Sequence, residues 1–365
     1  MTFELGVYTF GNTPRLADGR PGPTAQAVQD ALEAIRLADE VGLDFFGVGE
    51  HHMRAMPLTS PTSLVNAAAA TTNRITLSTA VSVLSTDDPI RVYQQLATAA
   101  SIAPGRIEMV AGRGSSAITF PLFDYDENDY DMLYASKLQL LMAVNAGENL
   151  SWNGPHRTRA LRNATVFPRP EQPLKIWLGT GGSPDSVYRA VELGLPMFLG
   201  ILGGTPEHWA QYGHAYRHAW AQAGHPAEKA DVAVAVHGFV ADTDAQARST
   251  YLDYEHRMMA EGMAELGRPA PPPGGRAADM KRGGMVFVGT PDEVADRILH
   301  LHGLLGHTRQ ILQMDVGGLP HRDFLHGIEL LGTKVLPQIR AELGDTLIPR
   351  ADQQSPSTTH QEGQL

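Results

Sequence analysis

Residues 75–112 read ITLSTAVSVLSTDDPIRVYQQLATAASIAPGRIEMVAG and contain one complete strand–helix–strand unit. Ile75–Val81 is uncharged and rich in β-branched residues, which predicts a buried strand, and Arg106–Ala111 predicts a second one. Pro89–Ile102, between them, has the length and spacing of a helix. Two buried strands separated by a helix are typical of βα units stacked around a parallel sheet.

The same alternation continues along the chain in both directions. Further strands are predicted at Glu4–Phe10, Phe45–Gly49, Lys175–Gly179, Pro196–Leu202, Val232–Ala241 and Gln310–Asp315. Further helices are predicted at Thr24–Val41, Thr62–Thr72, Asp129–Val144, Pro184–Leu193, Pro206–Ala223, Ala245–Leu266, Pro291–Leu305 and His321–Arg340. Eight βα units on roughly 250 residues plus insertions predict a (β/α)8 TIM barrel of class α/β. We expect one domain over residues 1–343, and a doubly wound sheet is the alternative.

Two helices carry more detailed expectations. In the first, Thr24 is the predicted N-cap, and Val28, Leu32 and Ile35 are expected on the inner face. At the other helix, Thr290 and Glu293 have the spacing of a capping box.

Three segments do not follow the pattern. Asn149–Pro170 is predicted to be an irregular insertion, such as a hairpin. Gly267–Gly284 is rich in Pro, Gly and Arg, and a long loop of this kind is either a functional lid or disordered. Gly344–Leu365 is polar and is expected to be an unfolded tail.

Composition excludes several function classes. A net charge of −11 over 365 residues argues against a nucleic-acid partner or an anionic membrane surface. The chain has no cysteine, so disulfides, zinc–thiolate sites and thiol nucleophiles are excluded. The N-terminus lacks the pattern of a signal peptide and the apolar stretches are too short to span a bilayer, so we expect a cytoplasmic protein without membrane contact.

Candidate catalytic residues follow the second predicted strand, since barrel enzymes place their active sites where strands end. The run Glu50-His51-His52 stands there. Side chains alternate along a strand, so Glu50 and His52 should share one direction and His51 the other. The pattern alone is as compatible with a histidine that caps the barrel rim as with an imidazole that faces the cavity as a general base or hydrogen-bond donor.

Candidate anion-binding residues follow the fourth and fifth predicted strands. Arg113 lies between two glycines, where a guanidinium can reach a planar or anionic ligand. The run from Gly179 to Ser186 leads into a helix whose free amide groups, with two serine hydroxyls, suit a phosphate monoester. Asp185 would have to point away from such a ligand. The candidate residues of this run are Gly181, Gly182, Ser183 and Ser186.

No metal site is predicted. The histidines of the second half do not cluster at strand ends, and solvated helix positions explain them. They are His300, His302, His307, His321 and His326.

Several of these runs together resemble the bacterial luciferase family of flavin monooxygenases. They are Glu50-His51-His52, Ser78–Leu84, Asp88-Pro89-Ile90-Arg91, Ala103–Arg106, Gly112-Arg113-Gly114 and Gly194–Met197. The similarity is collinear over about residues 3–340 and is weakest across Gly267–Gly284.

The resemblance implies an FMN-type flavin lying across the strand ends, bound tightly or exchanged as reduced FMN. It implies a cis peptide bond between Ala80 and Val81 that supports the flavin ring, and a phosphate pocket of Arg113, Gly182, Ser183 and Ser186. His51, next to Glu50, corresponds to the family's catalytic histidine. The implied reaction is that of an oxidoreductase in which reduced FMN and O2 form a C4a-peroxyflavin that oxygenates a small organic substrate. A reactive cysteine of luciferase corresponds to Gly112 here, and light emission is not implied.

Alternatives remain open at this point. A deazaflavin-dependent oxidoreductase uses the same barrel and a similar site, and a non-catalytic flavin-binding protein would keep only the phosphate pocket. A metal-dependent barrel hydrolase would need ligands from several strand ends, which the sequence does not supply. The resemblance also implies a homodimer and a separate flavin reductase that takes electrons from NAD(P)H. Loops decide the substrate, so its identity is not predicted.

Overall fold

The computed structural model describes residues 3–114, 118–155, 157–265, 267–270 and 272–344. Most of the tail predicted at Gly344–Leu365 therefore lies outside the described residues. Within the described ranges, no helix combines the length and the apolar character needed to cross a bilayer.

In the described part of the chain, eight parallel strands form a closed barrel. The strands are β1 (Glu4–Thr9), β2 (Phe45–Val48), β3 (Thr76–Val83), β4 (Ile107–Gly112), β7 (Lys175–Thr180), β8 (Met197–Ile201), β9 (Val232–Val240) and β11 (Arg309–Gln313). Each pairs with the next in this order, and β11 pairs with β1. The predicted barrel is confirmed, and the open doubly wound alternative is excluded because β8 also pairs with β9.

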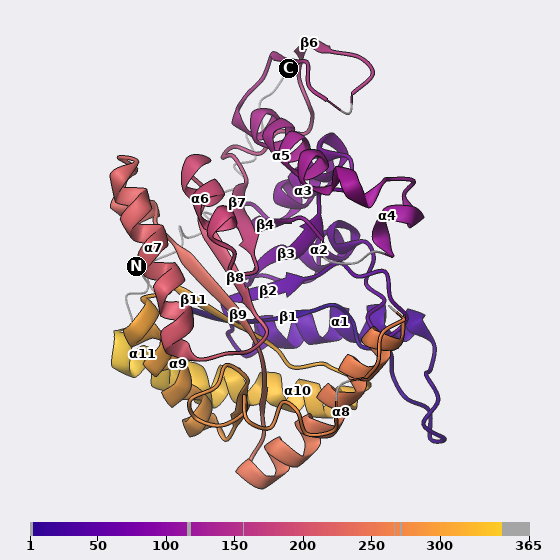
Figure 1. The fold of residues 1–365 in the computed structure, drawn as a ribbon, viewed down its shortest axis with the longest axis vertical. Helices are drawn as coiled ribbons and strands as arrows, with labels where there is room; N and C mark the ends of the chain where they lie inside the picture. Colours follow the sequence, from indigo (N-terminus) through magenta and orange to yellow (C-terminus); the bar gives the residue numbers. More distant parts are fainter. Residues whose placement is uncertain (1–2, 115–117, 156, 266, 271, 345–365) are drawn as a thin grey trace, which may run out of the picture.

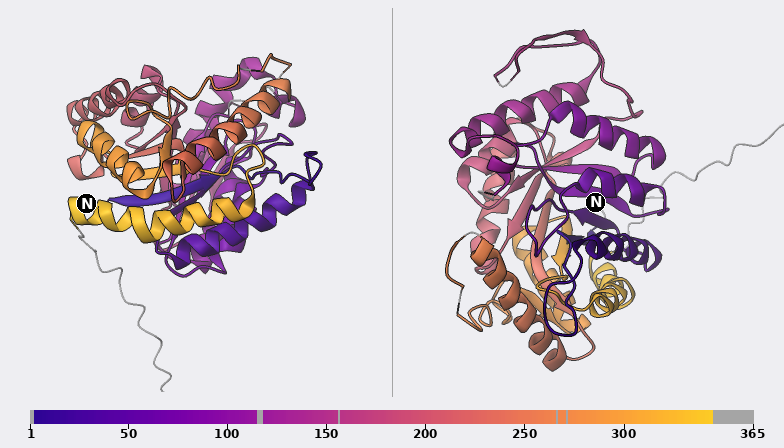
Figure 2. Two further views of the ribbon diagram at one scale, coloured as in Figure 1. Left: turned by 90° about the horizontal axis from the view of Figure 1, so that it is seen from below. Right: turned by 90° about the vertical axis from the view of Figure 1, so that its right-hand side faces the viewer.

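Helices surround the barrel (Figures 1 and 2). They are α1 (Thr24–Glu40), α2 (Pro61–Ala69), α3 (Pro89–Ile102), α4 (Thr119–Leu122), α5 (Tyr130–Ala146), α6 (Pro184–Glu192), α7 (Pro206–Gln222), α8 (Asp244–Glu265), α9 (Pro291–Leu305), α10 (His321–Leu330) and α11 (Leu336–Leu343). A π-helical turn, Leu331–Val335, joins the last two, so the single helix predicted there is one helical path interrupted by a wider turn.

The predictions for α1 are partly wrong. Pro23 is the N-cap residue, and no side chain caps the helix, so Thr24 does not have the predicted role. Val28 is 39% exposed, whereas the buried face consists mainly of alanines together with Ile35. Alanines let the helix approach the sheet closely, and this small-residue face is invisible to a search for large apolar side chains. At α9, by contrast, both hydrogen bonds of the predicted capping box between Thr290 and Glu293 are present.

Three further short strands of the described chain lie outside the eight strands of the barrel. The predicted hairpin forms from β5 (Leu150–Trp152) and β6 (Leu161–Ala164), which pair antiparallel and project from the barrel in Figure 1. A three-residue strand that was not predicted, β10 (Phe287–Gly289), extends the sheet by pairing with the end of β9. Three residues are too few to show a periodicity.

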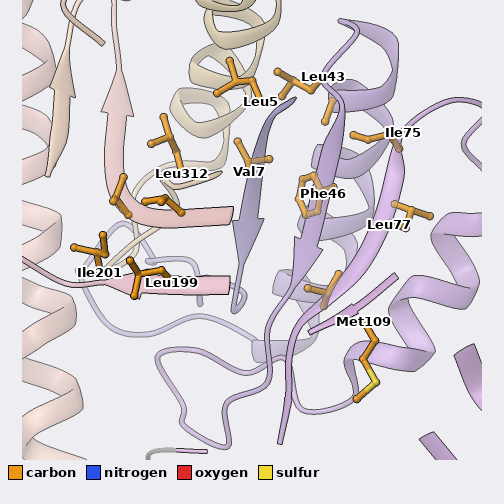
Figure 3. Close-up of a cluster of buried hydrophobic side chains, with 14 of the residues drawn as sticks. Leu5, Val7, Leu43, Phe46, Ile75, Leu77, Met109, Leu199, Ile201 and Leu312 are labelled. Carbon is orange, nitrogen blue, oxygen red and sulfur yellow. The ribbon is translucent and has the colours of Figure 1, made fainter. Parts of the chain in front are cut away.

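The core has two layers. The outer layer packs the outward faces of the strands against the helices, and Figure 3 shows part of it, with Val7 on β1, Phe46 on β2 and Leu77 on β3. The inner layer fills the barrel itself with large rings on some strands and alanines on others. Its buried members are Tyr8, Phe45, Ala80, Val110, Trp177, Phe198, Ala233, Ala235 and Ile311. A filled interior leaves the strand ends as the place for ligands.

Candidate active site

The parallel strands bring the predicted site residues to one end of the barrel. Glu50 and His51 follow β2, Val81 lies near the end of β3, Arg113 follows β4, and Ser183 follows β7. All of these are carboxyl ends of strands, so the structure places the whole candidate set on the same rim.

Glu50 fixes the loop that carries the histidines. It is buried, one carboxylate oxygen accepts the backbone N–H of Val83 at 2.8 Å, and the other lies 3.0 Å from Nε2 of His52. The expectation that Glu50 and His52 share one direction is therefore confirmed. Both side chains are already paired, so Glu50 is a positioning residue for the loop.

His51 points the other way. Its ring packs edge-on against the ring of Phe10, with centroids 4.5 Å apart, and neither ring nitrogen bonds to a described residue. Burial, with a smaller contribution from the neighbouring His52, lowers the pKa of His51 to about 4. The imidazole is thus neutral near pH 7, and one of its nitrogens can accept a proton.

Ala80 and Val81 lie near the end of β3, between the parts of the rim formed by β2 and β4. The peptide bond between them is cis, as the resemblance implies. The register between β3 and β4 shifts between Ala80 and Ser82, so Val81 stands in a bulge. A Cβ at Gly112 would lie 2.3 Å from Cγ2 of Val81, and one at Gly179 would lie 3.3 Å from Cγ1. Gly112 therefore has no space for a side chain, and this explains the absence of a cysteine-like residue there.

Two guanidinium groups flank the far side of the rim. Arg113 lies over the ring of Tyr130, 5.1 Å from its centroid, and pairs with the exposed Asp131 at 2.9 Å. Arg189, on α6, lies 5.7 Å from the ring centroid of Tyr134. Burial raises the pKa of the Tyr134 hydroxyl, and the charges of Arg189 and Arg113 act to lower it, so both guanidinium groups lie near this ring. Arg189 forms no ion pair with a described carboxylate. The sequence analysis did not identify it, although it follows Ser186 by three residues and so shares its helix face.

The start of α6 has the predicted cap. Ser183 accepts the backbone N–H of Ser186 at 3.3 Å and donates its hydroxyl to that of Ser186 at 3.0 Å, while Ser186 donates to the carbonyl of Ser183 at 2.7 Å. The two hydroxyls are thus bonded to each other and would have to rotate to reach a ligand. Gly182 has φ +82° and packs under Trp209, whereas nothing lies within 4 Å of a Cβ built at Gly181. The backbone at Gly181 is therefore open to a ligand.

These residues fit a flat cofactor with an anionic tail. In the strand order, Val81 of β3 lies between the His51 loop after β2 and Arg113 after β4. Thr180, at the end of β7, has a buried hydroxyl without a partner among the described residues. An unpaired buried donor beside an open glycine loop suits a phosphate-bearing ligand.

Comparisons with known proteins agree with this geometry. The sequence profile described as luciferase-like monooxygenase matches residues 7–308. Limonene 1,2-monooxygenase of Rhodococcus erythropolis is 23% identical over 356 residues, which cover 95% of this chain and 90% of that one. An F420-dependent glucose-6-phosphate dehydrogenase of Beutenbergia cavernae is 30% identical over 175 residues, covering 46% of this chain and 51% of that one.

Two solved structures share the fold. Monooxygenase RslO1 of Streptomyces bottropensis superposes with a TM-score of 0.79 at 23% identity, covering 92% of this chain and 99% of that one. The oxygenating constituent of 3,6-diketocamphane monooxygenase of Pseudomonas putida, in complex with FMN, gives 0.73 at 19% identity, covering 93% and 99%. Because the profile spans most of the barrel, the chain belongs to the luciferase-like monooxygenase family, which confirms the predicted enzyme class of a flavin-dependent monooxygenase.

Proposed function

We propose that this enzyme uses reduced FMN and O2 to oxygenate a small organic substrate. The observation that carries the proposal is the arrangement around Val81. A neutral His51 lies on one side of it, and the arginines Arg113 and Arg189 lie beside the open Gly181 loop on the other. A flavin ring needs a flat apolar support and its phosphate needs positive charge, and the rim offers both.

The roles proposed for individual residues follow from their contacts. Arg113, Arg189, Ser183, Ser186 and the amides of Gly181 and Gly182 would hold the phosphate, while Ala80 and Val81 would support the ring. Bound reduced flavin would supply the electrons that activate O2. His51 is neutral and has no described partner, so a nitrogen of its imidazole would accept or return a proton beside the flavin ring. Glu50 would keep the His51 loop in place.

A deazaflavin cofactor is the second candidate. It is favoured by the F420-dependent relative, which matches about half of this chain at the higher identity. Both cofactors would use the same rim, since both are tricyclic and carry phosphate. They differ in chemistry, because a reduced deazaflavin transfers hydride and does not activate O2.

The decisive experiment is a titration of the purified protein with FMN, riboflavin and F420, followed by stopped-flow mixing of the reduced complex with O2. FMN should bind best, and riboflavin, which lacks the phosphate, should bind more weakly. Arg189→Met and Arg113→Met should each weaken FMN binding roughly 10- to 100-fold and leave riboflavin binding unchanged. Arg322→Met, at an exposed arginine on α10, is the matched control.

Other results would contradict the proposal. Tight binding of F420 with no reaction of the complex with O2 would favour the dehydrogenase. If Arg113→Met and Arg189→Met weakened the binding of FMN and riboflavin equally, the two arginines would not be contacts of the phosphate. Turnover with chemically reduced FMN in place of NAD(P)H tests whether a separate reductase supplies the flavin. Sedimentation of the holoenzyme in the analytical ultracentrifuge tests the homodimer. Both the reductase and the homodimer stay proposals based on the resemblance.

A further inference from the structure

A second cavity lies at the same end of the barrel as the rim described above, around the loops that follow β1 and β11. It has a volume of about 380 Å3, within the range of small-molecule pockets, and is enclosed by the loops after β1 and β11 and by α1, α8 and α10. These three helices gather at one side of the barrel in Figure 1. None of His51, Val81, Arg113 or Ser183 lines the cavity, so its lining differs from that of the proposed flavin site.

Two unpaired buried polar atoms belong to residues that line this cavity. Asp315 follows β11 and is 5% exposed; one carboxylate oxygen is bonded to the hydroxyl of Thr9, and the other has no partner among the described residues. Arg15, after β1, pairs with Glu261 through one terminal nitrogen, while its buried Nε has no described partner. The carboxylate oxygen of Asp315 is an acceptor and Nε of Arg15 is a donor, and a buried polar atom without a hydrogen bond lowers the stability of the fold.

The charges on the walls are divided in the same way. Asp30 of α1 adds a second carboxylate near Asp315, since its charge contributes to the raised pKa of Asp315, which comes mainly from burial. Arg257 of α8 adds a guanidinium that stacks on Tyr254 and donates to the carbonyl of Gly317 at 3.3 Å. Arg257 forms no ion pair with a described carboxylate. The cavity is therefore lined by the carboxylates of Asp30 and Asp315 and by a guanidinium that has no described carboxylate partner.

The remaining wall is apolar. Ala27 and Ala31 of α1, Leu319 after β11 and Phe324 of α10 supply it. From these observations we propose that the cavity binds a small amino-acid-type zwitterion with an apolar side chain. Its carboxylate is bound by Arg257 and Arg15, its ammonium by Asp315 and Asp30, and its side chain lies against the apolar wall. Opposite charges at fixed positions select a molecule that carries both.

The cavity shares a wall with the active site. Asn12 donates to the carbonyl of Leu319 at 2.9 Å and accepts from Gly318 at 2.6 Å, which fixes the cavity side. On its other side the same segment bonds to the His51 loop, from Leu58 to Phe10 at 3.1 Å and from Thr13 to Ala55 at 3.3 Å. A ligand in the cavity would thus touch the segment on which the His51 loop rests.

The test uses the full chain, without flavin, and three matched probes measured by isothermal titration calorimetry. They are L-leucine, 4-methylpentanoate, which lacks the ammonium group, and 3-methylbutylamine, which lacks the carboxylate. L-phenylalanine and L-tryptophan extend the series to larger side chains. At least one zwitterion should bind, and its singly charged analogues should have affinities at least roughly tenfold lower.

Variants then assign each charge. Arg257→Met should weaken binding of the zwitterion at least roughly tenfold and leave the weak binding of 3-methylbutylamine unchanged. Asp30→Asn should also weaken binding of the zwitterion, but it should leave the weak binding of 4-methylpentanoate unchanged. Arg322→Met, which does not line the cavity, should bind as the unchanged protein does. Thermal unfolding confirms that each variant is folded, and Asp315→Asn serves as the second carboxylate variant. The proposal is overturned if no zwitterion of the series binds, or if Arg257→Met and Asp30→Asn bind it unchanged. Because flavin is absent from the assay, its outcome is independent of the proposed reaction.

Discussion

His51 differs from its neighbour His52 in having no described hydrogen-bond partner for its ring. His52, by contrast, is held by Glu50 at 3.0 Å. The ring of His51 rests on Phe10, and burial keeps it neutral. A neutral imidazole at a strand end is suited to proton transfer, whereas a paired one is suited to holding a loop.

Replacing His51 by alanine should therefore affect turnover far more than cofactor binding. We expect His51→Ala to reduce oxygenation roughly 10²- to 10⁴-fold and to change FMN affinity little. Product formation per oxidised flavin, measured beside an FMN titration, checks this. His326→Ala, at an exposed histidine, is the control. Normal turnover by His51→Ala would refute the role.

At the scale of elements, Arg276 ties the long loop that was predicted to be either a functional lid or disordered to the rest of the barrel. Arg276 pairs with the buried Glu255 of α8 at 2.9 Å and with Asp279 at 3.0 Å. A Cβ at Gly203, after β8, would lie 2.8 Å from Nη1 of Arg276, so the loop reaches the rim of the barrel. Its motion remains a prediction.

Removal of this tie should loosen the loop. Arg276→Met leaves Glu255, which is 1% exposed, without its cation, and an unpaired buried charge favours local opening. We expect limited proteolysis between residues 267 and 284 to become roughly tenfold faster, equivalent to about 1.4 kcal/mol of local stability. Arg282→Met, at an exposed arginine in the same loop, should leave the rate unchanged. Equal rates for all three proteins would show that the tie does not hold the loop.

The whole molecule is closed by a charged cluster at the opposite end of the barrel. Arg309 of β11 is 1% exposed and bonds to Glu4 of β1 and to Glu108 of β4, the latter at 2.7 Å. Burial alone lowers the pKa of Arg309, but the two carboxylates raise it above its usual value, so it remains charged. The cluster joins strands from the beginning, middle and end of the chain.

Loss of Arg309 should destabilise the entire barrel. Arg309→Met leaves two partly buried carboxylates close together, and the cost should approach the roughly 3–5 kcal/mol of breaking a fully buried pair. Urea unfolding should show this as a lower midpoint with an unchanged slope. A change of less than about 1 kcal/mol, comparable to a surface substitution, would mean that water screens the cluster.

Buried histidines should also make the molecule sensitive to acid. Burial is the first cause that lowers the pKa of His51 and of His237 to about 4 and that of His307 to about 3. Unfolded histidines titrate near pH 6.5, so between about pH 6.5 and 4 the unfolded chain binds more protons than the folded one. Stability should therefore be full above about pH 6.5 and fall as the pH drops through this window.

Asp315 acts in the opposite sense. Burial raises its pKa to about 7, so its contribution declines as the pH rises from about 4 to 7. Burial also raises the pKa of Glu4, Asp87 and Glu255, which act in the same sense as Asp315. We expect the three histidines to outweigh these groups and to give a net loss of stability toward acid. Urea midpoints at several pH values between 4 and 8 measure the slope, and His307→Leu should make it shallower. A flat profile would show that these histidines are protonated in the folded state.

The sequence by itself determined the barrel and the end at which the site lies. Apolar strand runs and helix spacing are local patterns, and the order of βα units then places Glu50, His51, Arg113 and Ser183 on one rim. What only the tertiary structure decided were contacts between distant segments. Arg113 and Arg189 contact the neighbouring rings of Tyr130 and Tyr134 on α5, Arg276 pairs with Glu255, and Asp315 and Arg257 line the same cavity. These contacts depend on strand register, helix rotation and the burial of single atoms. The inner face of α1 shows the same limit, because close packing selected alanines where the pattern favoured Val28. Such properties arise when the elements pack, and no local run of residues encodes them.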